Sequence, residues 1–423
     1  MDLKSSSFME LNTLDRIILL GILFKLFIGD YLGIGKLLNL VLVVLMLLLL
    51  VIERRRMPRR LLLCLPLLAL PIFFSVLANQ DIGNIAGNFL RIVQVAVYIL
   101  YIYSNLIRYG DAVPALLMET APAFNLILII NYIIMCIQYA IPGVLIASHS
   151  GVDVMQVDVV CGLFAYGSTH TVALVTVFVV VLNIFARISG LRKWHTNYVY
   201  QVSLALFSIV FAELNDNKAL WFFLPLVLAM IGGVYLWLNR QFLGMRFSIA
   251  VALMVLVSFS AYWLLPMVRS FVDENLINSI SIAMRAFSPT AYANGSDERF
   301  KIIAYAFSLP EFWMIGDGMG AAGLYEASYR GFPHFGQTDF GSIGILCGVW
   351  YYLYIIFMFA RVLSAGYARR RLIRVPVLIL IVCLSLYTQP FTQVRIAVPS
   401  AMLCIVLVQC LVAIFGQSEK RAE

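Results

Sequence analysis

The chain has 423 residues, of which 62% are hydrophobic and only 12% are charged. A soluble globular domain carries about 25% charged residues because its surface faces water, so this composition excludes a soluble protein. The formal net charge is +8. The basic residues stand in short clusters between apolar runs, so they indicate membrane topology rather than a nucleic-acid partner.

Apolar windows of membrane-spanning length recur along the whole chain. A spanning helix needs about 20 mostly apolar residues, and about twelve windows approach that length. In chain order they are Ile17 to Leu32, Leu37 to Ile52, Leu61 to Leu77, Phe89 to Leu106, Ala123 to Ile141, Thr171 to Phe185, Tyr198 to Ala212, Ala219 to Leu238, Phe247 to Leu265, Phe340 to Phe359, Val375 to Leu386 and Ile396 to Phe415. The sequence therefore predicts an all-α, polytopic integral membrane protein with about twelve transmembrane helices.

The arginine and lysine clusters predict how these helices are oriented. Basic clusters are typical of cytoplasmic loops. If both chain ends lie in the cytoplasm, every strong cluster falls on the cytoplasmic face. The clusters are Arg54 to Arg60, Arg187 to Lys193, Arg240 to Arg246, Arg361 to Arg374, and Lys420 with Arg421. The opposite orientation would violate the rule at each of these loops.

Two segments on the outer face are long enough to fold outside the membrane. They are the loop 142–170 and the larger loop 266–339, which lies between the ninth and tenth windows. The larger loop mixes charges of both signs with aromatic residues and glycines, and its stretch from Glu298 to Leu309 is amphipathic. We predict a partly helical loop attached to a single transmembrane domain, 1–423. The cysteine spacing resembles no metal site, so neither a metal nor a cofactor is predicted.

Cations near the outer ends of the predicted helices are the first candidates for a functional site. Charge is costly at membrane depth, so Lys25, Arg91 and Lys218 are singled out there. For Lys25 the alternative is snorkelling to the lipid headgroups. Lys218 ends the polar notch Glu213-Leu-Asn-Asp-Asn-Lys218, which is either a plain outer turn or a polar lining.

The large outer loop adds further candidates of two chemical types. Arg285, Arg299 and Arg330 carry guanidinium groups, which bind phosphate as a bidentate fork. His334 stands just before the tenth window, and a histidine there can accept a proton near neutral pH. Most lone histidines have no catalytic role, so that ordinary interpretation stays open.

Four stretches in and directly after this loop resemble one known family. The segment Asn294-Gly-Ser-Asp-Glu-Arg299-Phe-Lys301, an amphipathic helix, and the turn Ile315-Gly316-Asp-Gly318-Met-Gly320 are similar to the outer loop of the bacterial O-antigen polymerase and O-antigen ligase superfamily. The stretch from Phe332-Pro333-His334 to Asp339-Phe-Gly341-Ser-Ile-Gly344 resembles the histidine-containing part of the same loop. The resemblance covers Ala291 to Tyr354.

The resemblance implies an inner-membrane glycosyltransferase. Such an enzyme polymerises undecaprenyl-pyrophosphate-linked oligosaccharide repeat units into O-antigen, capsular or exopolysaccharide chains at the periplasmic face of the lipid bilayer. It implies no metal and no cofactor, and its partners would include a chain-length regulator and a flippase.

The resemblance also implies roles for individual residues. Arg299 would hold the pyrophosphate, and His334 would orient or deprotonate the acceptor hydroxyl. Lys218 stands where the family often has an arginine, and Arg91, Arg285 and Arg330 would add pyrophosphate contacts. Asp339 would orient His334 or bind a sugar, or it would cap the tenth helix.

Three other functions remain open from the sequence. An O-antigen ligase would transfer the polymer to lipid A core with the same architecture. A lipid-linked oligosaccharide flippase or transporter would be expected to have inverted repeats and helices broken at the membrane midplane. A scaffolding component could use the outer loop for docking. Trp313, Tyr325 and Tyr329 would stack on sugars or anchor the loop at the interface.

Overall fold

The computed structural model describes most of the chain. It covers residues 11–52, 65–110, 112–141, 160–164, 168–214, 218–238, 295–324, 328–333, 335–365 and 371–422, with single positions at 144 and between 256 and 273. Arg285 and His334, two of the predicted site residues, lie outside the described residues. For Lys218 the backbone position is described and the side chain is not.

The described part of the chain is almost entirely helical, which confirms the all-α prediction. The only strands described are a two-residue antiparallel pair, β1 (Ser328–Tyr329) and β2 (Phe332–Pro333). The short helices are the π-helix η2 (Lys25–Gly29) and the 3-10 turns η4 (Gly162–Phe164), η5 (Trp194–Thr196), η7 (Glu311–Trp313) and η8 (Phe335–Gln337). The α-helices are α1 (Thr13–Phe24), α2 (Gly35–Ile52), α4 (Leu65–Leu77), α5 (Ile82–Arg108), α6 (Val113–Ala140), α7 (Thr169–Ile188), α8 (Tyr198–Leu214), α9 (Lys218–Leu238), α13 (Gly295–Ser308), α14 (Asp339–Leu363), α15 (Arg371–Tyr387) and α16 (Val394–Ala422).

Seven of the described helices are long and apolar enough to cross a membrane. They are α2, α5, α6, α7, α9, α14 and α16. A chain with several such helices is a multi-pass membrane protein. The apolar parts of α8 and α15 are shorter than a full span.

The prediction of twelve spans is wrong for the described residues. Hydropathy marks where a helix is apolar, but the backbone hydrogen bonds decide where it ends. The first window changes to a π-helix at Lys25, and α8 and α15 each have only 17 residues. The window Phe247 to Leu265 lies mostly outside the described residues.

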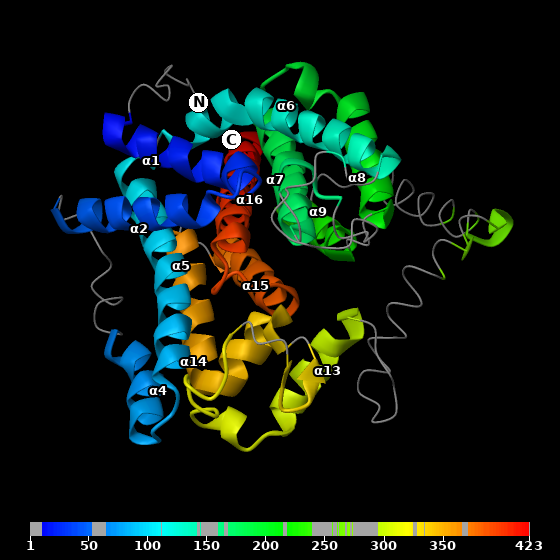
Figure 1. Ribbon diagram of the computed structural model, residues 1–423. Coiled ribbons are helices and arrows are strands. Elements are labelled where there is room, and N and C mark those ends of the chain that lie inside the picture. Colours follow the sequence, from blue (N-terminus) through cyan, green and yellow to red (C-terminus); the bar gives the residue numbers. More distant parts are fainter. Residues whose placement is uncertain are drawn as a thin grey trace.

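Helices α7 and α16 form the centre of the bundle. In α7, 83% of the spanning window is buried inside the protein, and in α16 the share is 78%. The Thr171 hydroxyl donates to the Arg395 carbonyl at one end (3.2 Å), and the Gln417 amide donates to the Ile188 carbonyl at the other (2.6 Å). The two helices therefore run side by side in the same direction. Both chain termini lie at one end of the molecule and α13 lies at the other (Figure 1).

Helix α14 is broken at Gly348, where the backbone has φ 83° and ψ 161°. The free carbonyls of Ile345 and Leu346 accept hydrogen bonds from Asp317 N and Gly318 N, each at 2.8 Å. A loop that follows α13 therefore completes the hydrogen bonding of the broken helix. A Cβ added at Gly348 would lie 2.3 Å from the carbonyl oxygen of Met314, so only glycine fits this approach.

Gly348→Ala is therefore expected to destabilise the protein by about 2 kcal/mol, through its positive φ and this clash. Thermal melting of the purified protein in detergent measures the effect. Gly232→Ala in α9 is the matched control, because a Cβ there meets nothing within 4 Å. Equal melting temperatures for the two variants would contradict the prediction.

Candidate functional site

Arg299 contacts a histidine that the sequence did not suggest. Its Nη2 lies 3.1 Å from Nε2 of His170. Arg299 stands in the second turn of α13, and His170 is the second residue of α7. The guanidinium also lies over the ring of Tyr387, the last residue of α15, 4.8 Å from its centroid. Three helices thus meet at this point.

The contact determines the protonation state of His170. A guanidinium has only donors, so Nε2 of His170 must accept the hydrogen bond and the imidazole proton must sit on Nδ1. His170 Nδ1 and Arg299 Nε are both buried, and neither has a hydrogen-bond partner among the described residues. Burying an unsatisfied donor costs about 1–3 kcal/mol. An unsatisfied donor of this kind is suited to a ligand that offers oxygen acceptors, and each of these two residues in contact carries one.

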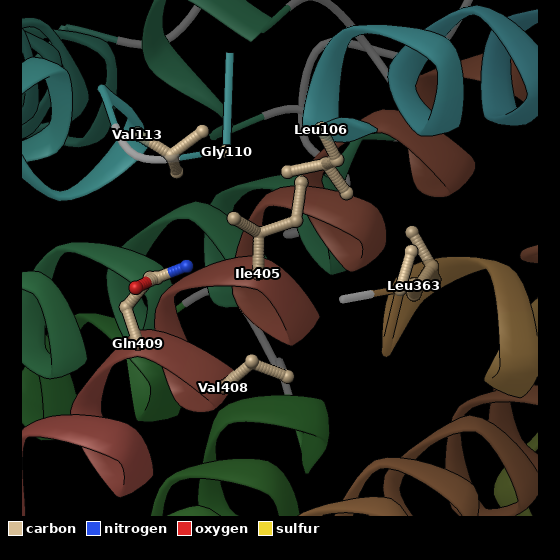
Figure 2. Close-up of a pocket in the computed structure, with 8 residues that line it drawn as sticks. Leu106, Gly110, Val113, Leu363, Ile405, Val408 and Gln409 are labelled. Atoms are coloured by element: carbon tan, nitrogen blue, oxygen red, sulfur yellow. The ribbon is translucent and has the colours of Figure 1, made fainter. Parts of the chain in front are cut away.

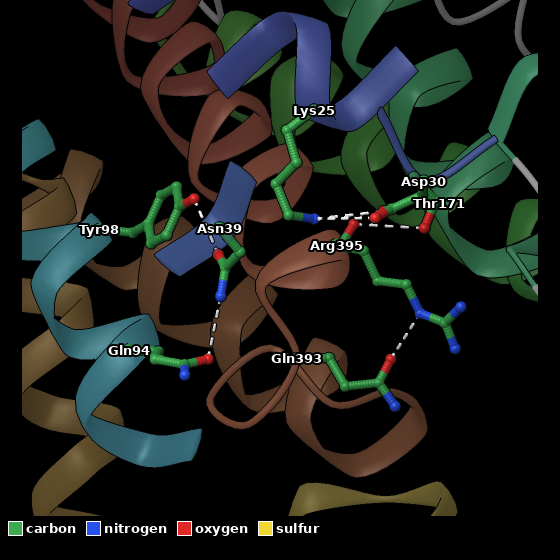
Figure 3. A network of polar contacts seen from close by, with 8 residues as sticks. All are labelled: Lys25, Asp30, Asn39, Gln94, Tyr98, Thr171, Gln393 and Arg395. Carbon is green, nitrogen blue, oxygen red and sulfur yellow. Dashed lines mark hydrogen bonds and ion pairs between the residues drawn. The ribbon is translucent and has the colours of Figure 1, made fainter. Parts of the chain in front are cut away.

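Arg395 is a second arginine near this point, because its carbonyl accepts a hydrogen bond from the hydroxyl of Thr171, the residue after His170. It is the second residue of α16, and its Nε donates to the amide oxygen of Gln393 at 2.9 Å (Figure 3). The charges of Arg299 and Arg395 both act on His170. Neither arginine forms an ion pair with a described residue. We call His170, Arg299, Tyr387 and Arg395 the Arg–His cluster.

Aromatic side chains of α9 close one side of the Arg–His cluster. Phe222 stacks on Tyr387 with ring centroids 6.2 Å apart, and Phe223 meets the same ring edge-on at 6.1 Å. Helix α9 begins at Lys218, one turn before Phe222. Helix α9, which begins at Lys218, therefore borders the cluster, and the predicted role of the Lys218 side chain stays a prediction.

Asp339 binds the turn that connects two residues of the Arg–His cluster, Tyr387 and Arg395. Its carboxylate is fully buried and accepts hydrogen bonds from Phe391 N (2.5 Å) and the Thr392 hydroxyl (2.6 Å). Its own N–H donates to the Thr388 carbonyl at 3.1 Å. The cap of α14 is Thr338 rather than Asp339. The carboxylate therefore holds the turn between α15 and α16, with Tyr387 on one side of that turn and Arg395 on the other.

Arg330 has a partner of its own. Its Nε and Nη2 each lie 2.6 Å from a carboxylate oxygen of Asp317, and the Tyr329 hydroxyl donates to the same carboxylate at 2.8 Å. The hydrogen bonds to Asp317 raise the pKa of Arg330 further. Burial and Asp317 together raise the pKa of Tyr329 to about 12. The charge of Arg330 is thus balanced by a carboxylate, and its binding to pyrophosphate stays a prediction.

The remaining predicted cations with described side chains are Lys25 and Arg91. Lys25 is buried in η2 and forms an ion pair with Asp30 at 3.2 Å (Figure 3), so it is paired within the protein. Arg91 is half-buried on α5, in the turn after Asn88. The predicted pairing of Arg299 with His334 stays a prediction, because His334 lies outside the described residues.

Two signals in the sequence could have identified His170 and Arg395. His170 stands directly before the sixth apolar window, just as His334 stands before the tenth. Arg395 stands directly before the twelfth window on the predicted outer face, where the positive-inside rule does not expect an arginine. Both residues therefore stand directly before a predicted span, and Arg395 is in addition an exception to the positive-inside rule.

A small pocket lies between α5, α6, α14 and α16, at a distance from the Arg–His cluster (Figure 2). It is lined by mostly apolar residues, with Gln409 as the longest polar side chain. On α16 its first lining residue is Ile405, ten residues after Arg395, which is about 15 Å along the helix. The pocket is therefore separate from the cluster.

No family model, curated protein or solved structure matches the chain.

Asp339→Asn is expected to lower stability by about 1–3 kcal/mol. The amide keeps the shape, but it replaces one acceptor oxygen with an NH2 donor that faces the N–H of Phe391 or the hydroxyl of Thr392. Thermal melting in detergent measures the loss. Asp81→Asn is the control, because Asp81 accepts from Gly83 N at the start of α5 and asparagine caps a helix equally well. An unchanged melting temperature for Asp339→Asn would show that the carboxylate does not hold the turn.

Proposed function

We propose that the protein is an inner-membrane glycosyltransferase that polymerises undecaprenyl-pyrophosphate-linked oligosaccharide repeat units. In this proposal both termini are cytoplasmic and the Arg–His cluster faces the periplasm. The observation that carries it is the contact of Arg299 with His170, beside which the hydrogen bond from Thr171 places Arg395, with no ion pair from either arginine to a described residue. The resemblance of the loop around Arg299 to the polymerase and ligase superfamily supports the same conclusion.

The charge of the cluster suits a pyrophosphate. Two guanidinium groups offer several N–H donors in fixed planes and match the two negative charges of a leaving diphosphate. The cluster is half-buried, so each contact stabilises charge more than it would in water. The Tyr387 ring limits where the Arg299 guanidinium can move, through a cation–π contact. Arg299 is therefore held ready for an anion.

His170 acts in this proposal as a donor and a positioning group. With Nε2 occupied by Arg299, its Nδ1–H is available to a phosphate or sugar oxygen. In the reaction an acceptor hydroxyl attacks the anomeric carbon, the bond from that carbon to the pyrophosphate oxygen breaks, and the hydroxyl proton passes to a base. His334 is proposed as that base. The pyrophosphate keeps the electron pair of the broken bond.

The two alternatives predict different products. An O-antigen ligase would use the same donor site and transfer the glycan to lipid A core. A transporter would need the break in α14 to be open to its cargo. The carbonyls of Ile345 and Leu346 at that break are already occupied by the loop, which weighs against transport.

Arg299→Ala and Arg395→Ala are each expected to reduce polymer formation by about a hundredfold or more, because each removes charge stabilisation from the leaving group. The assay supplies purified protein with lipid-linked repeat units and resolves the products by length. Arg299→Lys should recover only part of the activity, since lysine keeps the charge and lacks the fork.

Arg192→Ala is the control for these variants, because Arg192 is an exposed arginine at the opposite end of α7. Full-length polymer from Arg299→Ala would refute the proposed donor site. Transfer to lipid A core instead of a ladder of lengths would identify a ligase.

His170→Gln is expected to keep more activity than His170→Ala, although less than the native protein. The glutamine carbonyl can accept from Arg299 in place of Nε2, but it does not supply the Nδ1–H donor. Initial rates in the same assay measure the order. Equal rates for the alanine and glutamine variants would show that His170 does not position Arg299.

A further inference from the structure

The loop after α13 carries an exposed apolar surface. Phe307, Trp313, Met314, Ile315 and Trp350 are each between 46% and 69% exposed, and together we call them the tryptophan surface. The first four residues come from the end of α13 and from η7 with the two residues after it, whereas Trp350 comes from α14. A patch of this kind marks a contact with another molecule or with lipid.

Hydrogen bonds within the tryptophan surface satisfy both of its indole groups. Trp350 Nε1 donates to the Trp313 carbonyl at 2.9 Å, and Trp313 Nε1 donates to the Phe307 carbonyl at 3.0 Å. An indole usually stays near water because its N–H needs a partner. Here the donors are already paired, so the rings can contact hydrocarbon without an unsatisfied group.

The loop residues that follow this surface in the chain are held by α4 and α5. The Asn88 amide of α5 donates to the carbonyls of Met319 and Ala322, both at 2.8 Å. Met319 N donates to the Ser75 hydroxyl in the last turn of α4 at 2.6 Å. The loop thus lies directly beside the end of α4 and the first turns of α5. Paired backbone groups are a condition for contact with lipid.

The tryptophan surface continues the lipid-facing side of α14. Trp350 and Phe357 are seven residues apart, which places them on one face of the helix. Both are exposed, Phe357 by 58%. Since α14 is one of the candidate spans, this face is directed toward lipid. The surface therefore adjoins a region that the membrane already covers.

We propose that the tryptophan surface enters the membrane leaflet at the end of the bundle opposite the termini, where it contacts lipid acyl chains. Glu311 begins the same turn and is exposed, so its carboxylate limits the insertion to the headgroup boundary. The contact anchors the end of α13, the helix that carries Arg299. This inference concerns the membrane surface and stands whether or not the cluster transfers glycans.

Quenching of tryptophan fluorescence tests the proposal. The full-length protein is prepared with Trp313 as its sole tryptophan by replacing the other five with phenylalanine, and it is reconstituted in phosphatidylcholine vesicles. Acyl chains that carry bromine are expected to reduce the Trp313 emission strongly, and aqueous acrylamide is expected to have little effect. Quenching by acrylamide without quenching by the brominated lipid would overturn the proposal.

A single substitution gives an independent measurement that does not depend on the folding of the multiple variant. Trp313→Phe in the otherwise native protein should lower the share of fluorescence that brominated lipid quenches. Trp194→Phe is the matched reference, because Trp194 is half-exposed in η5 at the opposite end of α7. If Trp313→Phe leaves the quenchable share unchanged, the tryptophan surface does not contact acyl chains.

Discussion

The hydrogen bond between Arg299 and His170 joins two parts of the protein that are 129 residues apart in the sequence. Arg299 belongs to a helix of the large loop, and His170 begins the most buried span. Because the guanidinium can only donate, the contact keeps the imidazole neutral and directs its proton to Nδ1. The chemistry proposed for the site depends on this one contact, since it determines which atoms face a ligand.

The parallel packing of α7 and α16 places the second arginine. Hydrogen bonds at both ends keep the two helices in register, from Thr171 with Arg395 to Ile188 with Gln417. Helices that run in the same direction bring their first residues together, so Arg395 lies beside Thr171, the residue after His170, although the two are far apart in the sequence. Asp339 then fixes the turn before α16 through two hydrogen bonds that its fully buried carboxylate accepts. The buried carboxylate therefore fixes the turn that leads from Tyr387 to Arg395.

The glycine-rich turn and the break in α14 depend on each other. Gly316 and Gly318 have positive φ, and a Cβ at Gly316 would lie 2.4 Å from the Ile345 carbonyl oxygen. The N–H groups of Asp317 and Gly318 in the glycine-rich turn bind the two carbonyls that the break in α14 leaves free. The break at Gly348 also leaves room for the loop backbone to pack directly against α14. The same loop presents Trp313 and its neighbours on the outside. A loop fixed in this way can hold Arg299 at a constant level relative to the spans.

The sequence by itself determined the class of the protein and part of the site. Its repeated long apolar runs indicated an all-α multi-pass fold, because a helix satisfies its own backbone groups in lipid and needs about 20 apolar residues to span it. The amphipathic stretch from Glu298 to Leu309 predicted α13, which the structure places at Gly295–Ser308. The number of spans could not be obtained from hydropathy, since a helix ends where its hydrogen bonds end and not where its side chains become polar. Only the tertiary structure decided that Arg299 meets His170, that Arg395 joins them and that Asp317 takes Arg330, because partners so far apart in the chain are chosen by how the helices pack.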